Sequence, residues 1–229
     1  MDTVVITGAN RGIGLALTAR FVTAGHHVIA ACRNPAHATA LQKLQAGGKV
    51  EVLALDVADA QSVETFVNTL GKRTVDVLIN NAGIMGGDKQ GISNMDYAAW
   101  LRTFEINTLA PFRITTALLP NLKQSARARV ITVSSQMGAF GLEMGTDRYI
   151  YRSSKSAVSK VMQVLAAELK PDNIIVCPVH PGWVQTDMGG PNAQISADES
   201  ANGLFNLIDK LTLQQSGRFW SWNGTEHVW

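Results

Sequence analysis

Apolar and polar positions along the chain follow two alternating patterns. Short runs of β-branched and other apolar residues, typical of buried strands, alternate with segments whose apolar residues recur at helical spacing. Strands are expected at 3–7, 27–32, 50–54, 75–79, 129–134, 173–179 and 217–220. Helices are expected at 13–24, 37–46, 60–71, 96–123, 150–170 and 198–213. This alternation predicts a doubly wound α/β fold, in which a parallel sheet of about seven strands has helices on both faces.

The chain is expected to form one domain, residues 1–229. Its 229 residues, of which 46% are hydrophobic, are enough to bury a full α/β core. The Pro-Gly pair at 181–182 and the stretch 189–192 indicate a loop rather than a domain boundary.

A glycine-rich turn joins the first expected strand to the first expected helix. Residues 3–14 read Thr-Val-Val-Ile-Thr-Gly-Ala-Asn-Arg-Gly-Ile-Gly. Gly8, Gly12 and Gly14 would let the backbone turn tightly, approach a pyrophosphate and pack the helix on the strand. Their spacing differs from the common G-x-G-x-x-G fingerprint, and glycines that only turn the chain are the alternative interpretation. We expect a Rossmann-type dinucleotide-binding domain.

A tyrosine and a lysine at helical spacing are candidates for proton chemistry. Tyr151 and Lys155 lie four residues apart and would share one face of a helix. At about 4 Å and an effective dielectric constant of about 20, the ammonium would lower the phenol pKa by roughly three units. The spacing also arises by chance on solvated helix faces. Tyr149 is a rival, but the residue four positions after it is Ser153, so only Tyr151 has its lysine.

The end of the second expected strand indicates which nucleotide binds. NAD sites usually carry an acidic residue there, which hydrogen-bonds the ribose 2′-hydroxyl. This chain has Arg33 at that position and a second cation, Arg11, inside the glycine loop. Two guanidinium groups suit a 2′-phosphate, so we expect NADP(H). The alternative is that both are solvated surface arginines.

Four motifs in order resemble the short-chain dehydrogenase/reductase family. They are Thr7-Gly8-x-x-x-Gly12-Ile13-Gly14, then Asn80-Asn81-Ala82-Gly83, then Ser135, then Tyr151-x-x-x-Lys155. The similarity spans essentially the whole chain from Thr3 onward. The segment 180–188 and the ending 219–224, closed by Trp229, resemble the carbonyl-reductase, sniffer-like and C-factor-like branch.

The resemblance implies a catalytic group of four residues. Ser135 would hold and polarise a substrate carbonyl, and Tyr151 would protonate its oxygen as hydride arrives. Lys155 would bind the nicotinamide ribose and lower the tyrosine pKa, while Asn107 would hold a water for proton relay. Ser134 is a rival to Ser135, and Asn107 could instead serve a bend in its helix.

The resemblance also implies the residues that contact the nucleotide. Asp56 and Val57 would contact the adenine, although Asp56 could equally belong to the N-cap region of the next helix. Thr186 would hydrogen-bond the nicotinamide carboxamide, with Val184 beside it. The expected set is Gly8, Asn10, Arg11, Gly12, Ile13, Gly14, Arg33, Asp56, Val57, Asn81, Ala82, Gly83, Tyr151, Lys155, Pro181, Gly182, Val184 and Thr186.

The substrate side of the site is less specified. Trp183, Met188, Met144 and Phe140 could supply apolar walls, although such residues are more often core. The course of the loop 137–148 is left open. The segment 188–196, where relatives vary their substrate lid, is short, so we expect a fairly open pocket.

We expect an NADPH-dependent carbonyl reductase or alcohol dehydrogenase acting on an aldehyde, a ketone or a secondary alcohol. A non-catalytic NADP-binding sensor or a C-factor-like signalling protein is the alternative, and a dehydratase or epimerase is a third. The chain keeps all four candidate catalytic residues, which favours the reductase.

Composition argues against a nucleic-acid-binding, membrane or metal-binding protein. The 20 basic and 18 acidic residues, with a net charge of +2, provide no broad electrostatic footprint for nucleic acid. The first residues already form a strand, and no apolar run approaches the roughly 20 residues of a membrane span, so we expect a cytoplasmic protein without a membrane contact. Cys32 and Cys177 would be buried thiols without the spacing or histidine partners of a metal site.

A homodimer is expected through the helices near 104–123 and 150–170, because relatives pair these helices and most oligomers are two-fold symmetric. The longer segment before Tyr151 could block that surface.

Overall fold

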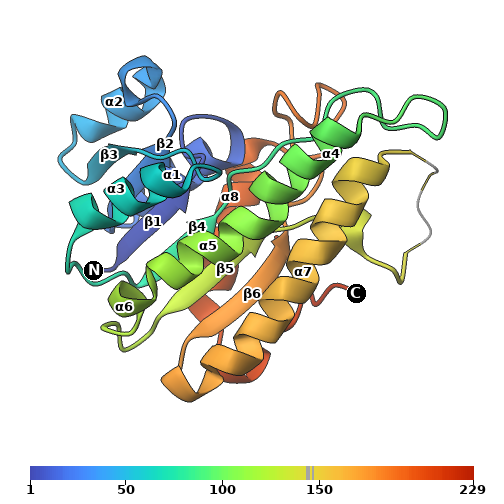
Figure 1. Cartoon of the computed structure of the whole chain (residues 1–229). Helices are drawn as coiled ribbons and strands as arrows, with labels where there is room; N and C mark the ends of the chain where they lie inside the picture. Colours follow the sequence, from blue (N-terminus) through green and yellow to red (C-terminus); the bar gives the residue numbers. More distant parts are fainter. Residues whose placement is uncertain (143–144, 146) are drawn as a thin grey trace.

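The computed structural model of the chain describes residues 1–142, 145 and 147–229 (Figure 1). Its strands form one sheet in the order β3-β2-β1-β4-β5-β6-β7, and every neighbouring pair is parallel. The strands are β1 (Thr3–Thr7), β2 (His27–Cys32), β3 (Val50–Ala54), β4 (Val77–Asn80), β5 (Arg129–Val133), β6 (Ile175–His180) and β7 (Trp220–Ser221). The α-helices are α1 (Gly12–Thr23), α2 (Thr39–Gln45), α3 (Ala60–Leu70), α4 (Tyr97–Phe104), α5 (Ala110–Ala117), α6 (Leu119–Leu122), α7 (Tyr149–Leu169) and α8 (Ala197–Lys210). The expected doubly wound parallel fold is confirmed.

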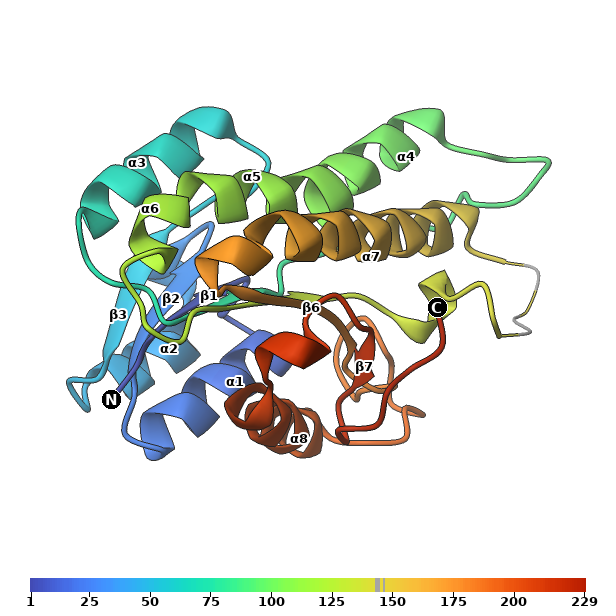
Figure 2. The same cartoon turned by 90° about the horizontal axis from the view of Figure 1, so that it is seen from below.

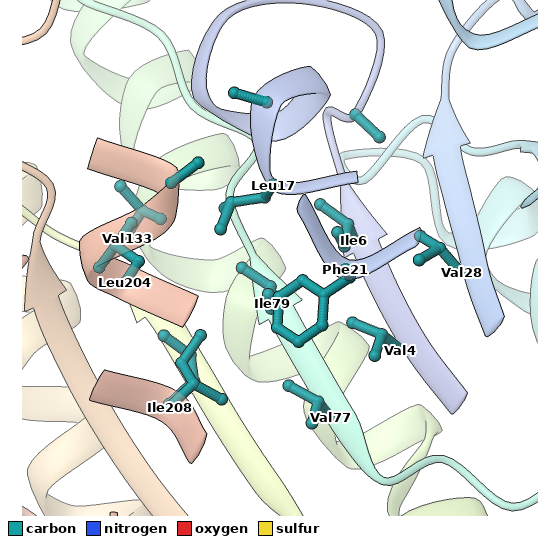
Figure 3. Close-up of a cluster of buried hydrophobic side chains, with 14 of the residues drawn as sticks. Val4, Ile6, Leu17, Phe21, Val28, Val77, Ile79, Val133, Leu204 and Ile208 are labelled. Carbon is teal, nitrogen blue, oxygen red and sulfur yellow. The ribbon is translucent and has the colours of Figure 1, made fainter. Parts of the chain in front are cut away.

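Helices cover both faces of the sheet. Figure 2 shows α3, α4, α5, α6 and α7 on one side and α1, α2 and α8 on the other. In β1, Val4 and Ile6 belong to the core cluster on the side of α1 and α8, whereas Val5 belongs to the cluster on the opposite face. Figure 3 shows the first cluster, where Phe21 of α1 and Ile208 of α8 lie over the strands. Because both faces are buried, β1 has an uninterrupted apolar run instead of an alternating one.

The sheet reverses its winding direction between β1 and β4. These strands are neighbours, although two other strands separate them in the chain. In open α/β sheets, ligands bind in the crevice outside the carboxyl ends of the strands at such a switch point. The segments that follow Thr7 and Asn80 therefore frame the expected site.

The helix expected at 96–123 runs without a gap from Tyr97 to Ala117 but contains a π-helical turn, and a turn at Leu118 separates its last part. It is divided into α4, a π-helical turn at Glu105–Leu109, α5 and α6. Pro111 and Pro120 lie in the first turns of α5 and α6, where a helix tolerates proline because no intrahelical N–H bond is lost. The π turn carries Asn107, and turns of this kind frequently occur at functional positions.

Smaller differences lie at the ends of elements. The last strand contains only Trp220–Ser221, and a 3₁₀ turn at Pro35–His37 replaces the expected start of α2. Cys32 and Cys177 are free and buried, as expected. Within residues 1–142, 145 and 147–229, no helix combines the length and apolar character needed to cross a membrane.

Candidate active site

A cavity of about 780 Å³ extends from the end of β2, past the glycine loop, to the first turns of α7. Its volume lies within the range of cofactor and small-molecule sites. Most residues expected to contact a nucleotide line it: Gly8, Asn10, Arg11, Gly12, Ile13, Arg33, Asp56, Val57, Asn81, Ala82, Gly83, Tyr151, Lys155, Pro181 and Thr186.

Three residues of the expected set, Gly14, Gly182 and Val184, do not line this cavity. They pack behind its wall. A Cβ on Gly182 would lie 2.4 Å from Cδ1 of Ile195, and Val184 pairs with the same Ile195 in an isolated β-bridge.

The wall also contains residues that were not expected to contact the nucleotide, including Ser134, which the sequence offered only as a rival to Ser135. They are Cys32, Asn34, His37, Leu55, Ile84, Ile106, Val133, Ser134, Gln185 and Asp187. Several lie at or just beyond the carboxyl ends of β2, β3 and β5, which is the position that could have identified them, since the ends of parallel strands meet at one edge of the sheet.

The glycine loop is held against the segment that follows β4. Gly8 has φ +64°, and a Cβ there would lie 2.9 Å from the Cα of Ala82. A Cβ on Gly14 would lie only 2.4 Å from the carbonyl oxygen of Gly8. The Asn81 side-chain amide donates to the carbonyls of Thr7 at 2.9 Å and Gly8 at 3.1 Å. This close contact leaves backbone, rather than side chains, facing the cavity next to the start of α1.

The cationic end of the cavity differs from the expectation in one respect. Arg33 follows β2 and is exposed, and among the residues that the structure describes it forms no ion pair. Arg11, in contrast, is paired: its Nη1 lies 2.6 Å from Oδ2 of Asp187, a residue of the loop after β6. Arg33 is therefore the cation available to an anion without exchanging a partner.

Asp56 lies in the cavity wall and does not cap the next helix. Its Oδ1 accepts a hydrogen bond from the backbone N–H of Ala58 at 3.0 Å. Asp59 caps α3 instead, because its side chain accepts from the N–H of Gln61. Asp56 is therefore not the N-cap residue, although its backbone N–H bonds Oγ of Ser62 in α3, and its contact with a nucleotide stays a prediction.

Tyr151 and Lys155 are both buried in the first turns of α7. The Lys155 Nζ lies 5.6 Å from the centre of the Tyr151 ring and donates a 2.8 Å hydrogen bond to the carbonyl of Val133. Burial lowers the pKa of Lys155 to about 8. Burial also raises the pKa of Tyr151, and hydrogen bonding to Ser135 and the charge of Arg148 offset only part of this rise.

This direction is opposite to the sequence-based expectation that Lys155 lowers the tyrosine pKa. The physical reason is that the protein interior solvates a phenolate poorly, and that the ammonium is directed at the Val133 carbonyl.

The two neighbouring serines have different partners. The Ser134 hydroxyl is buried and donates to the carbonyl of Lys155 at 3.1 Å, with Oγ of Ser159 at 2.7 Å. Ser135 accepts from the N–H of Met137, and its hydroxyl is close enough to Tyr151 to lower the pKa of the phenol. Although Ser134 is the one that lines the cavity, the serine hydroxyl next to the phenol belongs to Ser135.

Asn107 connects two segments of the site. Its Nδ2 donates to the carbonyl of Ile84 at 2.9 Å and to Oγ of Ser154 at 3.0 Å, and its Oδ1 accepts from the N–H of Ile84 at 2.9 Å. Both amide donors are used, so the side chain retains one lone pair on Oδ1 for a water. Asn107 does not line the cavity, and its contacts fasten the segment after β4 to α7.

Of the four expected apolar wall residues, Met188 lines the cavity. Phe140 is almost fully exposed, and Trp183 uses its ring N–H to bond the carbonyl of Gly189 at 2.9 Å. Met144 lies outside the described residues.

Comparisons with known proteins agree with this geometry. A family model described as short chain dehydrogenase matches residues 2–196. The chain is 42% identical over 167 residues to C-signal of Myxococcus xanthus, which covers 73% of this chain and 100% of that protein.

Two solved structures have nearly the same fold. The carbonyl reductase Sniffer of D. melanogaster superposes with a TM-score of 0.95 and 31% identity, and the match covers 100% of both chains. The NADPH-bound carbonyl reductase from chicken fatty liver superposes with a TM-score of 0.94 and 30% identity, covering 100% of this chain and 99% of that one.

Proposed function

Because the chain belongs to the short-chain dehydrogenase family, we propose that it is an NADPH-dependent carbonyl reductase. It moves a hydride reversibly between nicotinamide and an aldehyde, a ketone or a secondary alcohol. The observation that carries this proposal is that Tyr151 and Lys155 line the same cavity as the glycine loop, with the Ser135 hydroxyl near the tyrosine.

The cavity fits a phosphorylated dinucleotide. At Gly8 the backbone reaches the cavity without a side chain, and the uncapped start of α1 offers N–H groups to a pyrophosphate. We assign the 2′-phosphate to Arg33, and to Arg11 once it exchanges Asp187 for the phosphate. The NADPH found in the chicken reductase supports this assignment. When bound, the reduced nicotinamide supplies the hydride.

The remaining parts of the nucleotide are assigned to other residues that line the cavity. Asp56 and Val57 hold the adenine end, and Thr186 holds the carboxamide end beside Pro181.

Tyr151 acts as the proton donor in the reductive direction. Because burial raises its pKa, the hydroxyl is protonated at neutral pH, the state needed to donate a proton to a carbonyl oxygen. Ser135 holds the same oxygen through its hydroxyl. The carbonyl carbon gains the hydride, its oxygen gains the Tyr151 proton, and the phenolate is reprotonated from solvent. Lys155, with a pKa of about 8, is mostly charged at neutral pH and stabilises the phenolate.

A signalling protein is the second candidate, and the 42% identity with C-signal favours it. This hypothesis requires no turnover. It predicts that the protein binds NADPH and does not consume it in the presence of any carbonyl compound.

We also propose a homodimer. Leu101, Leu109, Phe112 and Val164 are large apolar side chains exposed on α4, the π turn, α5 and α7, helices that lie side by side in both views (Figures 1 and 2). Pairing two copies across a two-fold axis would cover this face.

The test of the function is NADPH consumption by the purified protein against a panel of aldehydes, aromatic ketones and keto esters. Turnover with at least one compound, lost in Tyr151→Phe and kept in Tyr149→Phe, is the expected result. NADPH binding without turnover across the panel would instead support the signalling hypothesis.

A further inference from the structure

A buried glutamine joins the segment after β4 to the helix that carries Tyr151. Gln90 lies in the irregular segment between β4 and α4 and is only 5% exposed. Its Nε2 donates to the carbonyls of Met85 at 2.8 Å and Gly87 at 2.7 Å. Its Oε1 accepts a hydrogen bond from the backbone N–H of Tyr151 at 3.2 Å. One side chain thus fixes the shape of the segment and reaches the proposed proton donor, 61 residues away in the sequence.

The start of α7 needs such a partner. The first N–H groups of a helix have no acceptor within the helix. The residue before α7, Arg148, has a left-handed conformation with φ 62°, and its side chain does not cap the helix. Gln90 therefore supplies an acceptor that a local Ser, Thr, Asp or Asn provides in most helices.

Neighbouring contacts hold the same turn from the same side. A Cβ on Gly86, four residues before Gln90, would lie 2.6 Å from Cγ2 of Ile150, so this segment packs directly on α7. Further along, the ring N–H of Trp100 donates to Oγ of Ser153 at 3.1 Å. These contacts with the turn around Tyr151 come from residues 86–107, on the side where Ile84 lines the cavity.

We propose that Gln90 is a positioning residue for Tyr151. It fixes the height and rotation of the first turn of α7, and thereby the distance from the phenol to Ser135 and to a bound carbonyl. This inference rests on the proposed function for its kinetic consequences. A displacement of about 1 Å at a reacting group can cost on the order of a hundredfold in rate.

A purely structural role is the competing explanation, because any buried amide with three bonds contributes to stability. The chain offers a matched control. Asn121 is buried and its Nδ2 also donates to two backbone carbonyls, those of Gly71 at 2.8 Å and Arg73 at 2.7 Å. These contacts lie at the opposite edge of the sheet from the cavity, next to the start of β4. Both amides can be replaced by apolar side chains of similar shape, in Gln90→Met and Asn121→Leu.

The experiment compares the two variants with the unmodified protein. Gln90→Met is expected to increase hydrogen exchange of the Tyr151 amide by about tenfold or more. It should lower kcat by about 10- to 100-fold while the Kd for NADPH stays within about threefold. The contact with Ser135 lowers the pKa of Tyr151, and the variant loses part of this contact. The pKa of Tyr151 should therefore rise, and so should the pH above which reduction slows. Asn121→Leu should lower the melting temperature comparably and leave kcat within about twofold.

Two results would overturn the inference: a kcat of Gln90→Met within about twofold of the unmodified protein, or an equal loss of kcat in Asn121→Leu. If Gln90→Met does not fold, the pH dependence of activity in Gln90→Glu tests the positioning role instead. Its carboxyl accepts from the Tyr151 N–H and, once protonated, donates to one of the two carbonyls. Its activity relative to the unmodified protein should therefore rise as the pH falls, and a constant ratio would refute the role.

Failure of the proposed function is recognised separately. If the unmodified protein reduces no carbonyl compound, the proposed reaction is wrong and the exchange measurement alone decides the inference. Faster exchange at Tyr151 in Gln90→Met then supports the positioning contact, and unchanged exchange contradicts it.

Discussion

Acid is expected to destabilise the protein through His180. This side chain ends β6, is buried, and its Nδ1 accepts a hydrogen bond from the backbone N–H of Gln136 at 3.3 Å. The ring of His227 faces it, with the two centres 5.5 Å apart. Burial, together with the charge of His227, lowers the pKa of His180 from 6.5 to about 4. Protonation of Nδ1 would remove the acceptor for the backbone N–H of Gln136, the residue that follows Ser135.

The magnitude follows from these two values. As the pH falls below 6.5, the unfolded chain binds a proton that the folded chain refuses until about pH 4. The stability is therefore complete above pH 6.5 and decreases as the pH falls toward 4. At 1.36 kcal/mol for each pKa unit, the loss is about 3 kcal/mol, a large part of the 5–15 kcal/mol typical of a domain.

Urea unfolding at pH 7, 5.5 and 4 measures this loss. Carboxylates also titrate in the window, so the informative quantity is the difference between the unmodified protein and His180→Gln, which retains a polar side chain that does not titrate. The variant should lose about 3 kcal/mol less than the unmodified protein between pH 7 and pH 4. His37→Gln, at an exposed histidine, controls for the substitution itself. Equal losses in the unmodified protein and His180→Gln would refute the reasoning.

Three further predictions concern function and assembly. Tyr151→Phe should lower reductase turnover by about 10²–10⁴-fold, the usual contribution of a positioned general acid, and Tyr149→Phe should not; the opposite result would show that the wrong tyrosine was chosen. Arg33→Asp should weaken NADPH binding by roughly tenfold to a hundredfold or more, with little effect on NADH, in fluorescence titrations. Equal losses of affinity for NADPH and NADH would show that Arg33 does not bind the 2′-phosphate. The unmodified protein should sediment as a dimer and Phe112→Asp as a monomer of 24.6 kDa, whereas a monomeric unmodified protein would exclude the proposed interface.

The fold could be predicted from the sequence because its signals are local. The strands β1, β2, β4, β5 and β6 are buried on both faces, so their apolar runs are nearly continuous, and the amphipathic helices lie between such runs. The π turn within the helix expected at 96–123 could not be predicted in the same way. Its π turn contains Asn107, whose side chain bonds Ile84 and Ser154, residues 23 and 47 positions away. Nothing in the local apolar pattern encodes such partners.

In the site, too, local patterns could be predicted from the sequence and contacts between distant residues could not. The glycine loop and the Tyr151–Lys155 spacing are short patterns, and the structure places them on one cavity. The contact between Gln90 and Tyr151 and the ion pair between Arg11 and Asp187 join residues 61 and 176 positions apart. They depend on the way the loops after β4 and β6 fold over the carboxyl edge of the sheet, which a pattern of residue types does not specify.

The proton chemistry of Tyr151 shows how burial can outweigh charge. The sequence argument placed an ammonium about 4 Å from the phenol in a medium of moderate dielectric constant, where attraction dominates. In the structure the Lys155 Nζ is 5.6 Å from the ring centre and donates to Val133, and both groups are buried, so the cost of solvating a phenolate decides the direction. A raised pKa keeps Tyr151 protonated, which suits a group that donates a proton to a carbonyl. Oxidation of an alcohol needs the phenolate as the acceptor, and this environment disfavours that form at neutral pH. The burial of Tyr151 at the start of α7 therefore fits its proposed role as a proton donor at neutral pH.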